Sequence, residues 1–214
     1  MAKTAIEKLL QGRCYRNIPA GRITTRAGDD GALIVEGYAT TFNEPYELYR
    51  WDNYTVREQI APGAFDECDM SDVIMQYNHE GRVFARNTNG TLEVTPDDVG
   101  LLSRADLSGT DLGRQVYEEI SGGYTTKMSF GFRIGETERV EKRDSETGAV
   151  DILITITKVS KLYDVSAVSL PANNGTSIEA VSARDFGKGV IDEIIEEVKK
   201  RDAHKAKIRI LTEV

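Results

Sequence analysis

Cysteine, histidine and long apolar runs are all scarce in this sequence of 214 residues. The two cysteines, Cys14 and Cys68, are too few and too widely spaced for a disulfide framework, and neither lies in a Cys-x-x-Cys zinc motif. The sequence also lacks a signal-peptide-like segment and any window of roughly 20 apolar residues. We therefore expect a protein of a reducing compartment, the cytoplasm or an assembly formed there, with no membrane span, metal or other cofactor.

Basic residues are outnumbered by acidic ones, which gives a formal net charge of -8. This charge argues against nucleic acid as a main partner, because phosphate binding needs a basic face. A hydrophobic fraction of 40% and a charged fraction of 29% are typical of a soluble globular protein. The expected substrate or partner is a protein.

The chain divides into three parts by composition. Residues 1–31 are predicted to form an N-terminal arm with a short helix over 4–11, and no chemistry is assigned to them. Residues 32–186 carry the strand-like patterns and form the main domain. Residues 187–214 are predicted to form a C-terminal helix and a basic tail.

The main domain is rich in short apolar runs bounded by turn residues, with one internal helix over 110–120. This pattern predicts an antiparallel barrel or sandwich, because no alternation of strands and helices is present. The polar, aromatic segment 46–59 is interpreted as a long loop or an irregular strand, either a lid or a satellite packing cluster. The predicted strands cover 32–42, 72–77, 90–95, 100–106, 125–134, 136–140, 150–158 and 162–171.

The C-terminal segment carries an apolar stripe at helical spacing, formed by Val190, Ile191, Ile194, Ile195 and Val198. An isolated helix with such a stripe is marginal in water. Residues 189–201 are therefore expected either to dock on the main domain or to join two protomers. Ion pairs are predicted between residues 196 and 200 and between 197 and 201.

The segment 125–134 has period-two alternation and places Ser129 on the polar face of a strand. Gly131 shares that face, and a glycine inside a strand often marks close backbone approach, here by a substrate. Ser129 is thus a candidate nucleophile. The alternative is an ordinary solvent-facing serine.

His79 and Asp164 are the other candidate site residues. His79 ends an apolar strand between Asn78 and Glu80, a position that suits a general base better than a core histidine. Asp164 shares a strand face with apolar residues, so its carboxylate needs hydrogen-bond donors. A histidine N–H would complete a Ser-His-acid triad, and an arginine or a backbone N–H would satisfy it equally well.

Two other mechanisms are open to these residues. Lys127 shares a strand face with Ser129 and could form a Ser-Lys dyad, although a lysine base must be desolvated to lose its proton. Cys68 could act with His79 as a thiol nucleophile. Neighbouring carboxylates would raise the thiol pKa and disfavour this mechanism.

Taken together, these motifs resemble the prohead maturation proteases of tailed bacteriophages. The resemblance covers about residues 33–183 and rests on ordered motifs. They are Glu36-Gly37-Tyr38-Ala39, Phe42-Asn43, Ala61-Pro62-Gly63-Ala64-Phe65, Asn78-His79-Glu80, Arg86, Asn89-Gly90-Thr91-Leu92, Met128-Ser129-Phe130-Gly131-Phe132, Asp164-Val165-Ser166 and Pro171-Ala172.

That family is distantly similar to the herpesvirus assemblins. The resemblance implies an α+β, mainly β fold, with an antiparallel β-barrel, a few surrounding helices and a C-terminal helix. It also implies a serine endopeptidase that cleaves scaffold and capsid proteins, and itself, inside the assembling prohead in the host cytoplasm. A homo-oligomer, such as a helix-mediated dimer, is compatible with it. The rival is a non-catalytic β-barrel that binds scaffold or capsid proteins.

The resemblance implies that Ser129 is the nucleophile and His79 the general base. Asp164 stands where the family pattern has a glutamate, and it becomes the orienting acid. Glu80 keeps the family's acidic residue after the histidine and competes for that role. The second histidine of the assemblins has no counterpart here, and Arg86 and Gly131 are candidate oxyanion or substrate-side groups.

Overall fold

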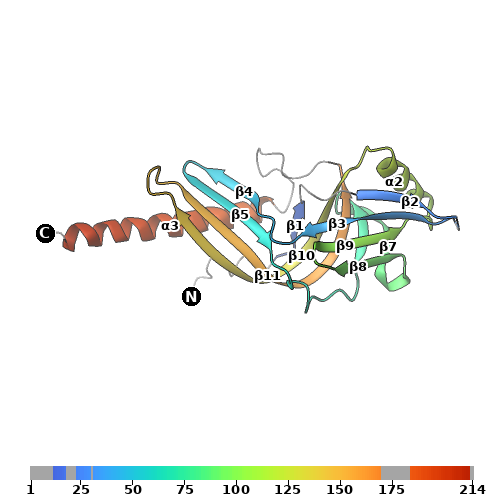
Figure 1. Ribbon diagram of the computed structural model, residues 1–214, viewed down its shortest axis with the longest axis horizontal. Helices are drawn as coiled ribbons and strands as arrows, with labels where there is room; N and C mark the ends of the chain where they lie inside the picture. The colour runs from blue at the N-terminus through green and yellow to red at the C-terminus, as the bar shows by residue number, and fades with distance from the viewer. Residues whose placement is uncertain (1–11, 18–22, 30, 170–183, 213–214) are drawn as a thin grey trace.

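A computed structural model describes residues 12–17, 23–29, 31–169 and 184–212 (Figure 1). The predicted helix at 4–11 and the end of the predicted strand 162–171 lie outside these residues. The described chain is mainly β, as predicted.

Two sheets contain the described strands. The seven-stranded sheet holds β1 (Cys14–Asn17), β10 (Lys127–Arg143), β11 (Val150–Val168), β5 (Tyr54–Ile60) and β4 (Tyr46–Trp51) in that order, with β6 (Ile74–Tyr77) beside β11 and β7 (Glu80–Arg86) beside β6. The four-stranded sheet holds β2 (Ile23–Ala27), β3 (Leu33–Thr41), β9 (Gly100–Asp106) and β8 (Leu92–Pro96).

The sheets do not close into a barrel, so the predicted barrel is not supported. In the described chain, β1 and β4 stand at opposite ends of the larger sheet order and do not pair with each other. The sheet is also not purely antiparallel. The first part of β11 pairs in parallel with β5, and its last part pairs in parallel with β6.

The strands β10 and β11 form one long antiparallel hairpin. The sequence predicted two shorter strands in place of each, divided near Gly135 and Val159. Register shifts along β10, between residues 131 and 137, let the strand bend and continue through this region.

The segment 46–59 forms the hairpin of β4 and β5, with a register shift between Glu47 and Tyr49. Of the two alternatives, the irregular strand is therefore confirmed, and the loop or lid is wrong. Buried and partly exposed residues alternate along β5. Val56, Glu58 and Ile60 are buried along β5. The buried Glu58 lies on the same face as its two apolar neighbours.

The internal helix is α2 (Asp111–Ser121), as predicted, and a short 3-10 helix, η1 (Asn87–Asn89), follows β7. Thr110 caps α2, since its hydroxyl accepts a hydrogen bond from the Gly113 N–H at 2.9 Å. Val116 and Ile120 are buried, whereas Leu112 is exposed. The apolar side of α2 packs into the main core.

The C-terminal helix α3 (Arg184–Thr212) lies at the opposite end of the molecule from α2 (Figure 1). Its buried residues are Ile191, Ile194, Ile195 and Val198, which form a second apolar cluster with side chains of β5 and β11. The helix therefore docks on its own sheet, one of the two expected arrangements. The side chain of Val190 is outside the description.

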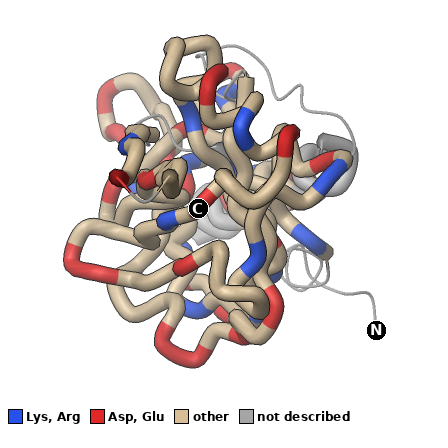
Figure 2. The backbone as a smooth tube through the Cα atoms, turned by 90° about the vertical axis from the view of Figure 1, so that its right-hand side faces the viewer, with Lys and Arg blue, Asp and Glu red and all other residues tan. Residues whose placement is uncertain are grey.

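Ion pairs on α3 differ from the predicted ones. Arg201 binds Glu141 of β10 at 2.5 Å, and Glu197 lies 3.6 Å from Arg139 of the same strand. Glu196 pairs one turn along the helix with Lys199. These charges thus connect the helix to the sheet. Acidic and basic residues are interspersed over the chain in Figure 2.

Candidate active site

His79 lies in the two-residue turn that joins β6 to β7. Tyr77 pairs with Glu80 across this turn, and both central residues have positive φ, 50° for Asn78 and 61° for His79. Positive φ at both positions is the feature of a type I′ hairpin turn, where asparagine is well tolerated. The turn is anchored because the Asn78 N–H donates to the Ala167 carbonyl at 3.0 Å. The imidazole is thereby held over the end of β11.

Ser129 and Asp164 lie on neighbouring strands. Ser129 of β10 stands opposite Ser166 of β11, and Gly131 stands opposite Asp164. Alternation along both strands therefore places the hydroxyl and the carboxylate on one face. Both residues are completely buried. The sequence predicted the polar face, but the structure shows that this face is covered.

A chain of hydrogen bonds joins the three candidate residues. Nε2 of His79 lies 2.6 Å from Oγ of Ser129, and Nδ1 lies 2.5 Å from Oδ1 of Asp164. The side chain of His79 is 13% exposed, whereas that of Asp164 is fully buried. The structure thus brings Ser129, His79 and Asp164 together in the order of a Ser-His-acid triad.

Asp164 is kept ionised by its neighbours. Burial on its own would raise the pKa of the carboxyl group, but hydrogen bonds from His79 and Ser166 and the charge of Arg13 lower the pKa below its usual value. The Ser166 hydroxyl donates to Oδ1 at 2.8 Å, and Arg13 binds Oδ2. An ionised carboxylate only accepts hydrogen bonds, so Nδ1 of His79 carries the proton. Nε2 is then free to accept the proton of Ser129.

Gly131 makes room for this carboxylate. A Cβ atom at Gly131 would lie 2.2 Å from Oδ2 of Asp164 and 2.9 Å from Cε1 of Tyr15. The sequence predicted that a substrate backbone approaches this glycine, and the backbone that pairs with it in the structure is that of β1. The space is already filled by Asp164 and Tyr15.

The segment that precedes the main domain completes the site. β1 pairs antiparallel with β10 along residues 129–132. The Tyr15 ring lies against the His79 ring, with 4.3 Å between their centroids. The hydroxyl of Ser129 also lies within hydrogen-bond distance of the Arg16 carbonyl, at 3.0 Å. Its single proton can be donated either to His79 or to this carbonyl.

No sequence signal identified Arg13, Tyr15 and Arg16 as site residues, because a four-residue strand is too short to show periodicity. Glu58 was also missed. Its signal was present, a carboxylate at the buried register between Val56 and Ile60 of β5. Glu58 was not assigned to the site because segment 46–59 was interpreted as a loop or an irregular strand.

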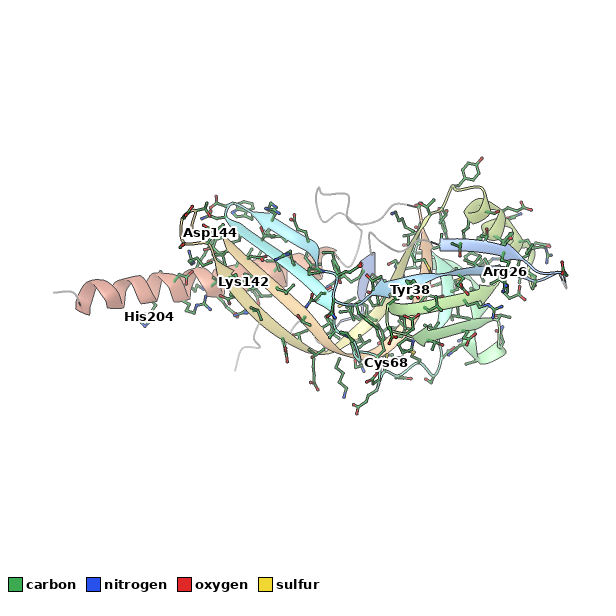
Figure 3. The ribbon with its side chains drawn as sticks, in the orientation of Figure 1. Arg26, Tyr38, Cys68, Lys142, Asp144 and His204 are labelled. Atoms are coloured by element: carbon green, nitrogen blue, oxygen red, sulfur yellow. The ribbon has the colours of Figure 1, made fainter. Side chains whose placement is uncertain are left out.

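The remaining candidate residues lie outside this hydrogen-bonded chain, as does His204, the second histidine of the sequence. Arg86 is paired with Asp72 at the surface, at 2.5 Å, and Glu80 is exposed at the start of β7. Burial raises the pKa of Cys68 to about 11, and the nucleophile hydrogen-bonded to His79 is Ser129. His204 is exposed on α3 (Figure 3). The acid bound to Nδ1 of His79 is thus Asp164.

The described ranges offer neither a metal-binding cluster nor a membrane-spanning helix. In these ranges, no group of three or more His, Cys, Asp or Glu side chains is arranged to hold a metal ion. Likewise, no helix in them has the length and apolar character needed to cross a membrane.

The sequence matches a known protein family over most of its length. The family model described as the caudovirus prohead serine protease matches residues 21–189. The chain belongs to this family. The match includes all three members of the hydrogen-bonded chain, whereas β1 precedes it.

The similarity to a solved structure is weaker. One similar solved structure is titled "Structure of the bacteriophage T4 capsid assembly protease, gp21", with a TM-score of 0.40 and 12% sequence identity. The alignment covers 73% of this chain and 96% of that chain. A search of curated proteins gave no significant match.

Proposed function

We propose that this chain is a serine endopeptidase of phage head maturation, with Ser129 as nucleophile, His79 as general base and Asp164 as orienting acid. The observation that carries the proposal is the continuous hydrogen-bonded chain from Ser129 through His79 to Asp164. Family membership supports the proteolytic activity and its serine type.

The geometry supports an acyl-transfer mechanism. His79 accepts the Ser129 proton at Nε2 while Oγ attacks the carbonyl carbon of a peptide bond. The resulting imidazolium is stabilised by the buried, ionised Asp164. His79 then donates the proton to the leaving amine, and a water molecule activated by the same base hydrolyses the acyl-enzyme.

The substrates proposed are the scaffold and capsid proteins of the phage, and the chain itself. The site of action is then the interior of the assembling prohead, in the host cytoplasm. A homo-oligomer and the division into arm, main domain and C-terminal helix remain proposals. The helix α3 forms its described contacts within one chain, through its buried face and through ion pairs with Arg139 and Glu141.

Substitution of each triad member tests the proposal. Ser129→Ala and His79→Asn should abolish the cleavage of capsid and scaffold subunits, with products followed by mass spectrometry. His79→Asn is the matched change because asparagine tolerates the positive φ at this position. Asp164→Asn should lower activity far more than Glu80→Gln. Cleavage that survives Ser129→Ala in a protease-free preparation would exclude the assigned nucleophile.

The second candidate is a non-catalytic module that binds scaffold or capsid proteins. One observation favours it: Ser129 has no exposed surface, and β1 is paired with the strand that carries it. A fluorophosphonate probe separates the two functions. Stoichiometric labelling at Ser129, absent in His79→Asn, indicates an activated nucleophile. Binding of capsid subunits with neither labelling nor cleavage would support the binding module.

A further inference from the structure

The backbone of β1 lies where a substrate strand would lie. β1 adds to the edge of β10 as an antiparallel strand, with Asn17 opposite Ser129 and Arg16 opposite Phe130. Addition of an extended peptide to a sheet edge is a common mode of peptide recognition. The Arg16 carbonyl is the peptide carbonyl that contacts Oγ of Ser129, at 3.0 Å. Arg16 therefore occupies the position of the residue before a scissile bond.

The side chain of Arg16 enters a site built around one carboxylate. Nε and a terminal nitrogen of Arg16 donate to the two oxygens of Glu58, at 2.5 and 3.1 Å. The Tyr46 hydroxyl donates to Oε1 of Glu58 at 2.5 Å. Glu58 is fully buried, and only 15% of the Arg16 side chain is exposed. We call Glu58 and Tyr46 together the Glu58 site.

The Glu58 site requires a cation. A buried carboxylate is costly unless it is paired and hydrogen-bonded, and Arg16 supplies both the charge and two of the donors. The planar guanidinium matches the two oxygens in a bidentate arrangement. Burial alone would lower the pKa of Arg16, but the charge of Glu58 outweighs it and raises the pKa. A peptide that took the place of β1 at the sheet edge would restore these contacts through a basic side chain.

We propose that Glu58 determines the specificity of this protease for a basic residue, arginine or lysine, immediately before the scissile bond. The inference rests on the proposed function. Its corollary is that the bond between Arg16 and Asn17 is a cleavage site in the chain itself, with β1 bound as an internal substrate. Tyr46 is a positioning residue that orients the carboxylate of Glu58.

The corresponding reaction is an ordinary acyl transfer. Oγ of Ser129 forms an ester with the Arg16 carbonyl carbon, and the bond from that carbon to the Asn17 nitrogen breaks. The serine proton passes through Nε2 of His79 to the new amine of Asn17. Water then hydrolyses the ester. In the structure the Ser129 hydroxyl faces the carbonyl oxygen, so the carbonyl has to rotate before attack on its carbon.

Peptides that differ in one group test the specificity. Two quenched fluorescent peptides with the sequence of residues 14–21, in which position 16 is the one basic residue, carry either arginine or citrulline, its uncharged isostere, at that position. The full-length wild-type chain should cleave the arginine peptide with a kcat/KM at least about 100-fold higher, since a site that is built to bind a polar group rejects an analogue lacking it. A lysine peptide should be cleaved at an intermediate rate.

Glu58→Gln provides the reciprocal change. It should reduce the kcat/KM ratio between the arginine and citrulline peptides to within about tenfold, since the carboxylate that binds the guanidinium is gone. Glu47→Gln removes an exposed carboxylate from the neighbouring strand β4 and should leave the ratio unchanged. Circular dichroism checks that each variant is folded. The wild-type ratio tests the proposal even where Glu58→Gln does not fold.

Cleavage of the chain itself gives an independent measurement. A Ser129→Ala chain, incubated with catalytic amounts of wild type, should yield a product that begins at Asn17. A second Ser129→Ala chain that also carries Arg16→Gln should resist, whereas Arg16→Lys should be cleaved. Intact-mass spectrometry distinguishes these products.

Four outcomes would overturn the inference. Equal cleavage of arginine and citrulline peptides excludes charge recognition, and an unchanged ratio in folded Glu58→Gln excludes Glu58 as its source. Ser129-dependent cleavage of capsid and scaffold proteins only after non-basic residues would leave the proposed function intact and refute this specificity. Absence of any Ser129-dependent cleavage would refute both.

Discussion

Replacement of Gly131 by alanine tests how the acid is positioned. The added Cβ would lie 2.2 Å from Oδ2 of Asp164, whereas ordinary van der Waals contact begins at 3.4 Å. The carboxylate must therefore retreat by about 1 Å, a displacement that can cost about 100-fold in rate when it misplaces a catalytic group. The same carboxylate holds His79, Ser166 and Arg13. Any retreat disrupts at least one of these contacts.

The effect on stability should be smaller than the effect on activity. Overpacking of a buried site typically costs about 1–3 kcal/mol, which is a fraction of the roughly 5–15 kcal/mol that stabilises a folded domain. Gly131→Ala should therefore remain folded while its kcat/KM for capsid or scaffold cleavage falls about 100-fold. The assay combines urea denaturation with cleavage kinetics on the same preparation.

Gly135→Ala is the matched control on the same strand. Its Cβ would lie 3.0 Å from Cγ, 3.1 Å from the carbonyl oxygen and 3.3 Å from Cβ of Lys158, so it requires shifts of only a few tenths of an ångström and touches no triad residue. Gly135→Ala should lose little activity. If folded Gly131→Ala cleaves as fast as wild type, the placement of Asp164 does not matter for the reaction, and the assigned orienting role is refuted.

Three further predictions concern the turn, the buried acid and the C-terminal helix. His79→Gly should be more stable towards urea than His79→Ala by about 1 kcal/mol, because alanine is strained at φ 61°, and equal stabilities would contradict the strained turn. The depressed pKa of Asp164 stabilises the fold above the unfolded value of about 3.9. This contribution is lost as pH falls through the lower folded pKa. The difference in unfolding free energy between wild type and Asp164→Asn should therefore be constant above about pH 4 and shrink below it. A constant difference down to pH 2 would argue against a depressed pKa of Asp164. Ile194→Ala should destabilise the chain by about 2–5 kcal/mol in thermal and urea unfolding, because Ile194 is buried against the sheet. Substitution of the exposed Asp192 by alanine should not. Unchanged stability of Ile194→Ala would mean that α3 does not contribute to the core.

The sequence predicted much of the fold because strand faces and turn residues are local. Alternation at Met128, Phe130 and Phe132 predicts the buried face of β10, and all three are buried. The barrel and the purely antiparallel pairing were wrong because strand partners are not local. Nothing in the pattern of β11 distinguishes a parallel neighbour from an antiparallel one.

The candidate site shows the same division. His79, Ser129 and Asp164 were identifiable from their residue types and surroundings, and the structure brings them into one hydrogen-bonded chain. The carboxylate was expected to bind either a histidine or an arginine, and it contacts both His79 and Arg13. The contact of Gly131 with Asp164 could not be predicted, because Asp164 comes from another strand.

The sequence separation within the site has a consequence for the timing of activity. The two hydrogen bonds of the triad join residues 50 and 85 positions apart, and the contact of Arg13 with Asp164 spans 151 positions. Contacts of such separation require closure of long loops, which makes them slow to form. Synthesis proceeds from the N-terminus, so Ser129 leaves the ribosome before its orienting acid exists. Under the proposed mechanism a nascent chain that still lacks Asp164 is therefore inert, and the appearance of proteolysis during refolding reports the formation of these long-range contacts.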